Sequence, residues 1–395
     1  MLVTEIQQEI ARRTIDGWLL VDFRGNNPIF TEIAALPGGT TRRCALWIPS
    51  LGTPLLFGST VDAYVLSQSA WQVILYHSFS EFQEALRRTL RIAHTIALEF
   101  TPNGANPPIS YVDGGFIDWL RTLGLTIQSS GDLISTLVRW DADQVHWHQE
   151  AARIVDQVRR ASCQQTISDL LAAKPLQEHD VAQRIIAAFH SANLAHGATD
   201  VAANAHAADP HYASSPSNPN PLHLGDLLLI DLWAKQNHPR APFADSTWVA
   251  FLGPRADIPR AIQERFDALR RARDQALDLL QHSLSISQPL RGRDLDRHAR
   301  SILIEAGYGS ELIHRTGHSL GCRHVHGEGT NLDDTEFPDD RLIQPHTGLT
   351  IEPGLYVPGK FGLRLEVSVV TTEHGLIVTT ESQEMLDTIE TISAY

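Results

Sequence analysis

The first 140 or so residues alternate short hydrophobic runs with stretches in which hydrophobic residues recur at helical spacing. Three hydrophobic runs, at 18–23, 45–48 and 95–100, are each of a length typical of buried β-strands. Between the last two runs, hydrophobic residues at 79–90 recur every three to four positions, which predicts an amphipathic helix. This alternation predicts a small α/β domain over residues 1–142.

The rest of the chain begins with two helical patterns and ends in short hydrophobic strands. Residues 143–173 and 178–194 have hydrophobic positions at helical spacing and contain neither Gly nor Pro. The further predicted elements are a Pro-rich loop at 209–225, strands at 227–232 and 247–252, helices at 259–282 and 294–306, and strands at 349–351, 363–370 and 376–379. This order predicts a second domain, residues 143–395, of the α+β class, with an antiparallel sheet covered by helices.

Composition and charge exclude several classes of protein. Of 395 residues, 43% are hydrophobic and 20% are charged, which is typical of a folded globular protein. The formal net charge of −14 repels phosphate backbones and anionic membranes, so neither nucleic acid nor a membrane surface is expected as a partner. The first residues lack the basic and apolar regions of a signal peptide, and no later apolar run approaches the ~20 residues that span a bilayer.

The cysteines indicate a reducing compartment. The chain has only three of them, Cys44, Cys163 and Cys322. They are far apart and odd in number, which argues against a disulfide framework and against a zinc site made of thiolates. A cytoplasmic location is therefore expected.

Four acidic residues lie within or beside hydrophobic strands of the second domain: Asp231, Asp245, Glu352 and Glu366. A buried carboxylate is costly unless it is paired or bound to a cation, and a shared site for divalent metal explains all four. His318 could add a nitrogen ligand. Carboxylates with one imidazole favour Mn²⁺, Co²⁺ or Zn²⁺ in a two-metal site over a structural zinc, and two such metals predict a hydrolase.

Simpler explanations exist for each residue taken alone. An acidic residue at a strand end commonly caps a helix, closes a turn or forms a salt bridge. A histidine in a Gly-rich turn, such as His318, is as readily satisfied by backbone groups, and His324 fits an exposed turn. The joint pattern of four carboxylates is what favours a metal site.

Five segments of the chain together resemble the pita-bread metallopeptidases, the family of aminopeptidase P, prolidase, methionine aminopeptidase and the metal-free creatinase. LIDLWA with FADSTWV resembles the two-aspartate segment of the family, and TGHSLG resembles its histidine segment. IEPGLY and LRLEVSVV resemble its first and second glutamate segments. The resemblance covers nearly the whole chain and implies a creatinase-type α/β domain at 1–142 and a pita-bread catalytic domain, a curved antiparallel sheet covered by helices, at 143–395.

The resemblance implies a site for two divalent metal ions, with Mn²⁺ preferred and Co²⁺ or Zn²⁺ as alternatives. In the family pattern, Asp231 becomes a terminal ligand of one metal. His318 and Glu352 become ligands of the other metal. Asp245 and Glu366 become ligands that bridge the two.

The resemblance also implies residues that act on the substrate. DPHY and HVHGEG resemble segments that supply substrate-contacting histidines, here His211 and His326, and His314 matches a further pocket histidine of the proline-specific members. Glu352 is expected to transfer the proton during hydrolysis. Arg364 is expected either to bind a substrate carboxylate, to anchor the neighbouring glutamate ligand, or to form an ordinary surface pair.

The chain departs from the family pattern in two places. It has one extra residue between His318 and His326, which leaves His324 as an alternative to His326. The loop between the two aspartates, residues 234–243, is longer than in the best-known aminopeptidases P, so the rim of the pocket is expected to differ.

The large leading domain favours the proline-specific branch, because methionine aminopeptidases of this fold usually lack it. The resemblance therefore implies an Xaa-Pro dipeptidase acting on small peptides with proline in the second position, and implies a homodimer. An Xaa-Pro aminopeptidase acting on longer peptides is the alternative. A catalytically inactive binding protein and a creatinase-like enzyme are more remote, since all five ligand types are present.

A serine hydrolase is the competing hydrolase class. GHSLG at 317–321 also satisfies the G-x-S-x-G pattern, with Ser319 as the nucleophile. That motif requires a buried strand before the serine and a helix after it. ELIHRT is a poor strand and CRHVHGEG is a poor helix, so the sequence favours the metal-dependent class.

Overall fold

The computed structural model describes residues 3–392. The chain divides into two compact units, Met1–Leu137 and Val138–Tyr395. This division comes slightly before the predicted domain boundary, because Trp140 belongs to the second unit. Its indole fills the space left by Gly348, where a Cβ would lie 1.9 Å from the Trp140 ring.

The first unit is built on a six-stranded sheet in the order β4-β3-β2-β1-β5-β6. Its strands are β1 Gly17–Phe23, β2 Arg43–Pro49, β3 Leu55–Ser59, β4 Gln72–Tyr76, β5 Thr95–Leu98 and β6 Thr126–Ser129. Its helices are α1 Val3–Arg12, α2 Pro28–Ala34, α3 Ala63–Leu66, α4 Phe79–Thr89, α5 Gly114–Thr122 and α6 Gly131–Leu137. Alternate residues of β1 enter two hydrophobic clusters, Leu20 with α1, α2, α3 and α6, and Leu19 with α4 and α5, so helices cover both faces of the sheet.

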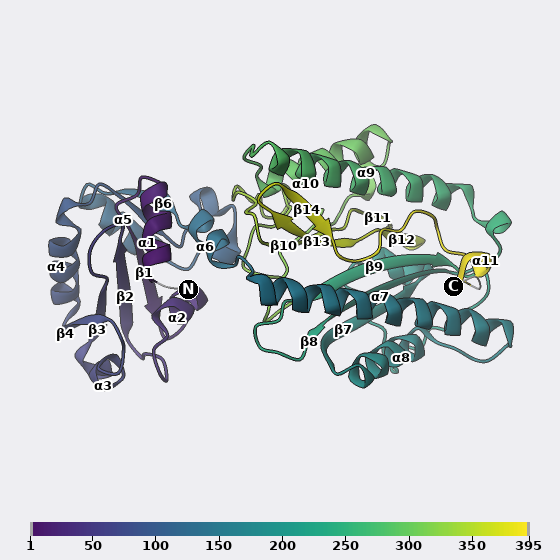
Figure 1. Ribbon diagram of the computed structural model, residues 1–395, viewed down its shortest axis with the longest axis horizontal. Helices are drawn as coiled ribbons and strands as arrows, with labels where there is room; N and C mark the ends of the chain where they lie inside the picture. The colour runs from purple at the N-terminus through teal and green to yellow at the C-terminus, as the bar shows by residue number, and fades with distance from the viewer. Residues whose placement is uncertain (1–2, 393–395) are drawn as a thin grey trace. The chain divides into compact units, whose positions relative to one another are not determined.

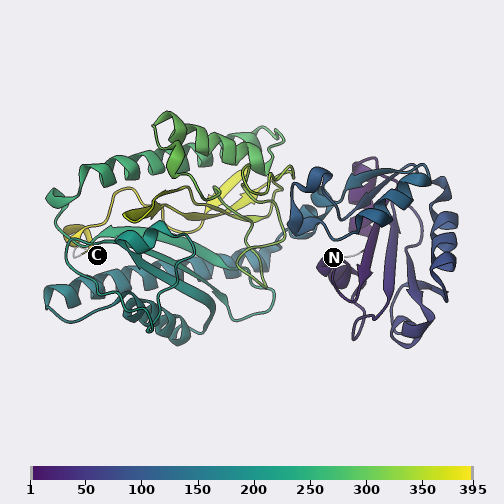
Figure 2. The ribbon, with the colours of Figure 1, turned by 180° about the vertical axis from the view of Figure 1, so that it is seen from behind.

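The second unit has three small sheets between helices. Its helices are α7 Ala142–Leu171, α8 Glu178–Ser191, α9 Arg260–Ser285, α10 Gly292–Glu305 and α11 Ile389–Ile392. Its strands are β7 Leu194–Ala203, β8 Leu227–Gln236, β9 Ala244–Phe251, β10 Gly348–Ile351, β11 Gly354–Val357, β12 Phe361–Arg364, β13 Val367–Thr372 and β14 Gly375–Val378. Within this unit the strands lie between α7 and α8 on one side and α9 and α10 on the other (Figure 1), and the view from behind shows the same layers (Figure 2).

The sheets of the second unit are antiparallel, in the orders β7-β8-β9, β10-β13-β14 and β11-β12. A pair of hydrogen bonds joins the first of these sheets to the second: the Asp245 N–H donates to Ser368 Oγ over 3.1 Å, and the Ser368 hydroxyl donates to the Asp245 carbonyl over 2.8 Å. The link brings β9 and β13 together, although more than a hundred residues separate them in sequence.

The side chains of β8 and β9 alternate between two hydrophobic layers. Leu228 and Ile230 pack in the cluster that contains α7 and α8. Leu229 and Val249 pack in the cluster that contains α9. Asp231 continues the alternation of Leu229, so its carboxylate lies on the side of the sheet opposite α7.

The structure corrects two predicted boundaries. The helix expected at 178–194 ends at Ser191, because Asn193 adopts a left-handed conformation with φ of 56° that ends the helix, and Leu194 then opens β7. The strand expected at 363–370 is divided into β12 and β13 around Glu366, because the chain changes partners from β11 to β10 there. The loop expected at 209–225 contains no helix or strand.

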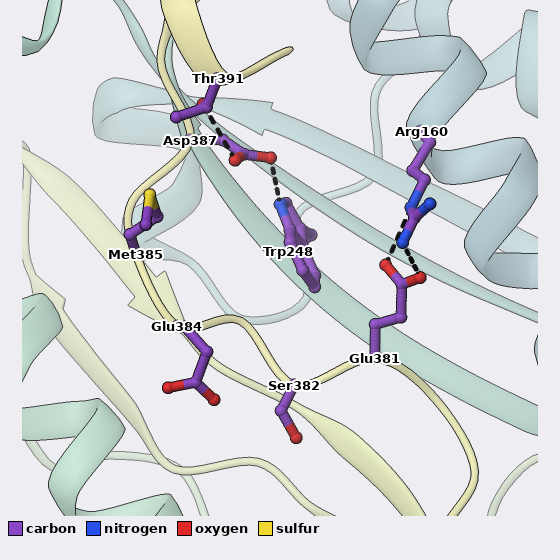
Figure 3. A pocket seen from close by; sticks show the side chains of 8 residues that line it. All are labelled: Arg160, Trp248, Glu381, Ser382, Glu384, Met385, Asp387 and Thr391. Carbon is purple, nitrogen blue, oxygen red and sulfur yellow. Dashed lines mark hydrogen bonds and ion pairs between the residues drawn. The ribbon is translucent and has the colours of Figure 1, made fainter. Parts of the chain in front are cut away.

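The face of β9 turned toward α7 carries a separate cavity of about 630 Å³ (Figure 3). Trp248 lies in its wall and donates from Nε1 to Asp387 Oδ2 over 2.7 Å, while Arg160 pairs with Glu381. Since Trp248 is adjacent to Thr247 in β9, it points to the opposite face from Thr247. This cavity therefore lies on the other side of the sheet from the acidic residues of the candidate site.

No helix among residues 3–392 is both long enough and apolar enough to cross a membrane.

Candidate metal centre

Three of the predicted metal ligands meet at one point in the second unit. Asp245, His318 and Glu366 are buried, and one ligand atom from each lies within 4.8 Å of the others. Asp245 comes from β9, His318 from the segment that follows α10, and Glu366 from the break between β12 and β13. The division of the strand predicted at 363–370 is thus what places Glu366 in this cluster.

Two oxygens of this cluster have no partner within the protein. Asp245 Oδ1 and Glu366 Oε1 are both inaccessible to solvent and accept no hydrogen bond. Burial, and then the charge of Asp245, raises the pKa of Glu366 well above its usual value; burial likewise raises the pKa of Asp245. Buried carboxylate oxygens are normally satisfied, so these two are positioned to bind a cation.

His318 is oriented as a metal-binding histidine would be. Its Nδ1 lies 2.9 Å from the Ser319 carbonyl, which can only accept, so Nδ1 carries the proton and Nε2 has a free lone pair in the neutral ring. Nε2 lies 3.6 Å from Asp245 Oδ2 and 3.4 Å from Glu352 Oε1. A lone pair that faces two carboxylate oxygens is stabilised by a cation between them, and the residues therefore fit a divalent metal.

Backbone pairing explains the placement of His318. Thr350 N–H donates to the His318 carbonyl over 2.9 Å, and the His318 N–H donates to Thr350 Oγ1 over 2.9 Å. This close approach requires a glycine at 317, because a Cβ on Gly317 would lie 2.2 Å from the Thr350 carbonyl oxygen. The glycine before the histidine in TGHSLG thus allows the histidine segment to lie against β10.

The other two predicted ligands, Asp231 and Glu352, lie beside Arg364 and outside the three-residue cluster. The guanidinium of Arg364 pairs with Asp231, and its Nε lies 3.6 Å from Glu352 Oε2. Burial raises the pKa of Asp231 well above its usual value, and Arg364 opposes this shift. Burial acts to raise the pKa of Glu352, but the charge of protonated His314 and His318, and then of Arg364 and Arg315, lowers it to about 2.

Arg364 has a different partner from the two suggested by the sequence. Its side chain is buried and directed to Asp231, and it reaches Glu366 only through Thr247. Arg364 Nε donates to Thr247 Oγ1 over 2.9 Å, and the Thr247 hydroxyl donates to Glu366 Oε2 over 2.6 Å. This arrangement also rules out an exposed surface pair for Arg364.

The structure distinguishes His326 from His324. The segment between Ser319 and Gly327 forms a tight turn, closed by the Gly327 N–H donating to the Ser319 carbonyl over 2.7 Å. Both histidines are exposed in this turn. The His326 ring stands edge-on to His318 with centroids 4.3 Å apart. The extra residue of the segment is accommodated in the turn, and His326 is the histidine beside the cluster.

Two of the nearby histidines are neutral at physiological pH. Desolvation, with a smaller effect from His318, lowers the pKa of His326 to about 3, and burial lowers the pKa of His314 to about 4. His314 Nδ1 donates to the Arg315 carbonyl over 2.8 Å. His211 lies on the loop after β7, with an exposed side chain.

Asp200 and Tyr356 also lie at the site, and neither was predicted from the sequence. Asp200 lies directly opposite Asp231 in the pairing of β7 with β8, and it lines a small cavity together with Tyr356 and Arg364. The Tyr356 hydroxyl accepts a hydrogen bond from Arg364 Nη1 over 3.3 Å. Asp200 gave no signal because a helix was expected up to residue 194 and β7 was not recognised.

The geometry of Ser319 does not support a serine nucleophile. Its side chain is buried, and Oγ has no hydrogen-bond partner, so no base activates it. Residues 311–316 form no strand, and residues 320–328 form no helix. The strand–turn–helix context of a nucleophile elbow is absent from this described part of the chain.

More than half of the chain is similar in sequence to known peptidases. Residues 146–373 match the model of metallopeptidase family M24. The probable dipeptidase PepE of Mycobacterium bovis is 31% identical over 199 residues, which cover 50% of this chain and 47% of that protein. The Xaa-Pro dipeptidase of Pyrococcus furiosus is 30% identical over 189 residues, 48% of either chain. The chain thus spans about half the length of these curated relatives.

Solved structures resemble almost the whole chain. Dipeptidase PepE from Mycobacterium ulcerans has a TM-score of 0.67 at 22% identity, covering 98% of this chain and 96% of that one. X-prolyl aminopeptidase from Caenorhabditis elegans, a cytosolic enzyme with a di-nuclear active site, has a TM-score of 0.63 at 15% identity, covering 96% and 62%. These likenesses bear on the fold alone, and they confirm the predicted α+β class with a pita-bread second domain.

Proposed function

Because this chain belongs to metallopeptidase family M24, we propose that it is a metal-dependent peptidase that hydrolyses the bond before proline in small Xaa-Pro peptides. The observation that carries this proposal is the pair of buried, unpartnered oxygens, Asp245 Oδ1 and Glu366 Oε1, beside the His318 lone pair. The similarity of half the chain to an Xaa-Pro dipeptidase supports the substrate class.

Five residues would hold two divalent ions: Asp231, Asp245, His318, Glu352 and Glu366. Oxygen ligands with a single imidazole suit Mn²⁺, and Co²⁺ or Zn²⁺ are the alternatives. When bound, the ions lower the pKa of water and polarise the scissile carbonyl.

Glu352 performs the proton transfer. Arg364, whose Nε lies 3.6 Å from Glu352 Oε2, favours the ionised carboxylate, which can accept a proton from the attacking water. As the bond between the carbonyl carbon and the proline nitrogen breaks, Glu352 delivers that proton to the nitrogen. The net reaction adds one water across the peptide bond.

The histidines act on the substrate rather than on the metals. His326 is neutral and lies beside His318, so one of its ring nitrogens can donate to the oxyanion that develops on the scissile carbonyl. His211 and His314 contact the substrate from the loop after β7 and from the segment before His318. Arg364 keeps the Asp231 carboxylate in place and is not free to bind a substrate carboxylate directly.

An assay of Ala-Pro against Ala-Pro-Ala, with Mn²⁺ added to metal-free protein, tests the proposed substrate class. The dipeptidase proposal predicts faster hydrolysis of Ala-Pro. Preference for Ala-Pro-Ala would establish instead an Xaa-Pro aminopeptidase, the activity of one structural neighbour. Hydrolysis of Ala-Ala at the same rate as Ala-Pro would contradict proline specificity.

We also propose that the protein forms a homodimer in the cytoplasm. The family resemblance implies a homodimer, which light scattering of the purified chain tests directly. We propose a cytoplasmic location, in line with the few, widely spaced cysteines of the chain.

A further inference from the structure

A buried carboxylate outside the metal site, Glu178, collects an unusual number of hydrogen bonds. Glu178 opens α8, and only 1% of its surface is exposed. It accepts hydrogen bonds from the N–H of Ala203 at 2.6 Å, the Tyr212 hydroxyl at 2.7 Å, Asn220 Nδ2 at 2.8 Å and His206 Nδ1 at 3.0 Å. All four donors belong to one segment, residues 203–220, that runs from the end of β7 toward β8.

These contacts lie on both sides of His211. The His206 and Tyr212 rings stack with centroids 4.2 Å apart and planes inclined by 26°. Between them, the His211 N–H donates to Asp209 Oδ1 over 3.0 Å, and the Tyr212 N–H donates to the Asp209 carbonyl over 3.1 Å. The loop that carries His211 is therefore a compact turn whose two flanking aromatic rings bind the same carboxylate.

Within the described part of the chain, no hydrogen bond or ion pair holds the His211 side chain itself. Its position depends on the backbone of the turn, and the turn depends on Glu178. An uncharged amide could not replace this carboxylate, because Gln has one acceptor oxygen and would present an NH₂ group to the remaining donors.

We infer that Glu178 is a positioning residue for substrate binding: it fixes the loop 203–220 and thereby the place of the His211 imidazole at the substrate site. This inference rests on the proposed function, which assigns His211 to the substrate. The negative charge of Glu178 suits its position at the beginning of α8, where the free N–H groups of the helix favour an anion.

A double-mutant cycle tests this inference. In the Mn²⁺-loaded protein, Glu178→Gln is expected to lower kcat/KM for Ala-Pro by on the order of 10- to 100-fold, since a small displacement of a substrate-binding group has effects of this size. Metal content should not change. In a His211→Ala background, the same Glu178→Gln substitution should change kcat/KM by less than about twofold, because its effect acts through His211.

Asp180→Ala is the matched control. Asp180 accepts the Gln177 N–H over 2.9 Å at the start of the same helix, and among the described residues no hydrogen bond or ion pair joins its side chain to the loop 203–220. Its removal weakens α8 but should leave kcat/KM within about twofold of the wild-type value. If Glu178→Gln does not fold, Tyr212→Phe removes one of the four hydrogen bonds and should give a smaller loss that also vanishes in the His211→Ala background.

An equal loss from Glu178→Gln with and without His211 would overturn the inference, since it would reveal a general structural role. If the wild-type protein hydrolyses no Xaa-Pro peptide, the proposed function fails. The effect of Glu178 on the loop is then tested separately, by amide hydrogen exchange. Amides of residues 204–212 should exchange faster in Glu178→Gln while those of β8 do not change. Identical exchange in the loop would refute the role of Glu178.

Discussion

The Arg364 guanidinium and the Asp231 carboxylate form an ion pair that joins β12 to β8 beside the three clustered ligands. The pair places a fixed positive charge at the side of the site where Asp231 and Glu352 approach each other. In the absence of metal, this charge limits the repulsion between the two carboxylates.

Removal of this charge should destabilise the metal-free protein more than the metal-loaded one. Arg364→Met leaves Asp231 without its buried partner, which typically costs ~3–5 kcal/mol of unfolding free energy. Bound divalent ions would replace part of the lost positive charge. Denaturant unfolding of both proteins with and without Mn²⁺ measures the effect, with Arg364→Lys as the charge-retaining control. An equal loss of unfolding free energy with and without Mn²⁺ would show that the charge of Arg364 does not act together with the bound metal.

The hydroxyl of Ser319 should be dispensable. It is buried without a hydrogen-bond partner, so Ser319→Ala removes a group that forms no favourable interaction. The expected kcat is within about twofold of wild type, whereas loss of a true serine nucleophile typically costs ~10⁶-fold. A loss approaching that size, with metal content intact, would restore the serine hydrolase hypothesis.

The histidines should separate into two groups. His326→Ala and His211→Ala should each retain metal but lower kcat/KM, because one hydrogen-bond donor to a developing oxyanion is commonly worth ~3–4 kcal/mol. His324→Ala should be nearly silent, since it is the His326 ring, and not that of His324, that stands against His318. Steady-state kinetics of the three variants on one Xaa-Pro peptide decides the assignment. A severe defect in His324→Ala alongside a silent His326→Ala would reverse it.

The stability of the first unit should fall as pH rises. Burial raises the pKa of Glu99 from 4.5 to about 7, against hydrogen bonds from Trp18, Asn27 and Ser130. The folded state therefore binds the Glu99 proton more tightly than the unfolded state does. The contribution of Glu99 to the free energy of unfolding is complete below pH 4.5 and is lost as pH rises through 7, a change of about 3 kcal/mol.

Glu99→Gln provides the comparison, because it removes this titration. Relative to wild type, the variant should gain about 3 kcal/mol of unfolding free energy between pH 4.5 and pH 8. Hydrogen exchange of the β1 amides at the two pH values measures this difference. A constant difference between the two proteins across this range would show that Glu99 does not titrate in the folded state.

The sequence predicted the parts of the site that depend on local patterns. An acidic residue inside a hydrophobic strand is visible without a structure, as Asp231 and Asp245 illustrate. His318 was indicated as a possible nitrogen ligand by the four carboxylates and by the resemblance of TGHSLG to the histidine segment of the family. The α+β class followed from the order of helices and strands.

Relationships between distant segments could not be predicted in the same way. The partner of Arg364 depends on how β12 crosses β8, and sequence spacing contains no information about that crossing. The choice between His324 and His326 depends on a turn that accommodates the extra residue. Glu178 accepts hydrogen bonds from residues at the end of β7 and after it. β7 was not predicted, because the helical pattern of the sequence continues to Leu194.

The most direct test of the account is a metal titration of the chelator-treated protein, with bound metal and Ala-Pro hydrolysis measured on the same samples. We expect negligible hydrolysis without metal and recovery with Mn²⁺ as two equivalents bind. Glu366→Gln should bind metal markedly more weakly, since it lacks one of the unpartnered carboxylate oxygens. Full hydrolysis by the metal-free protein, or unchanged metal affinity in Glu366→Gln, would contradict the account.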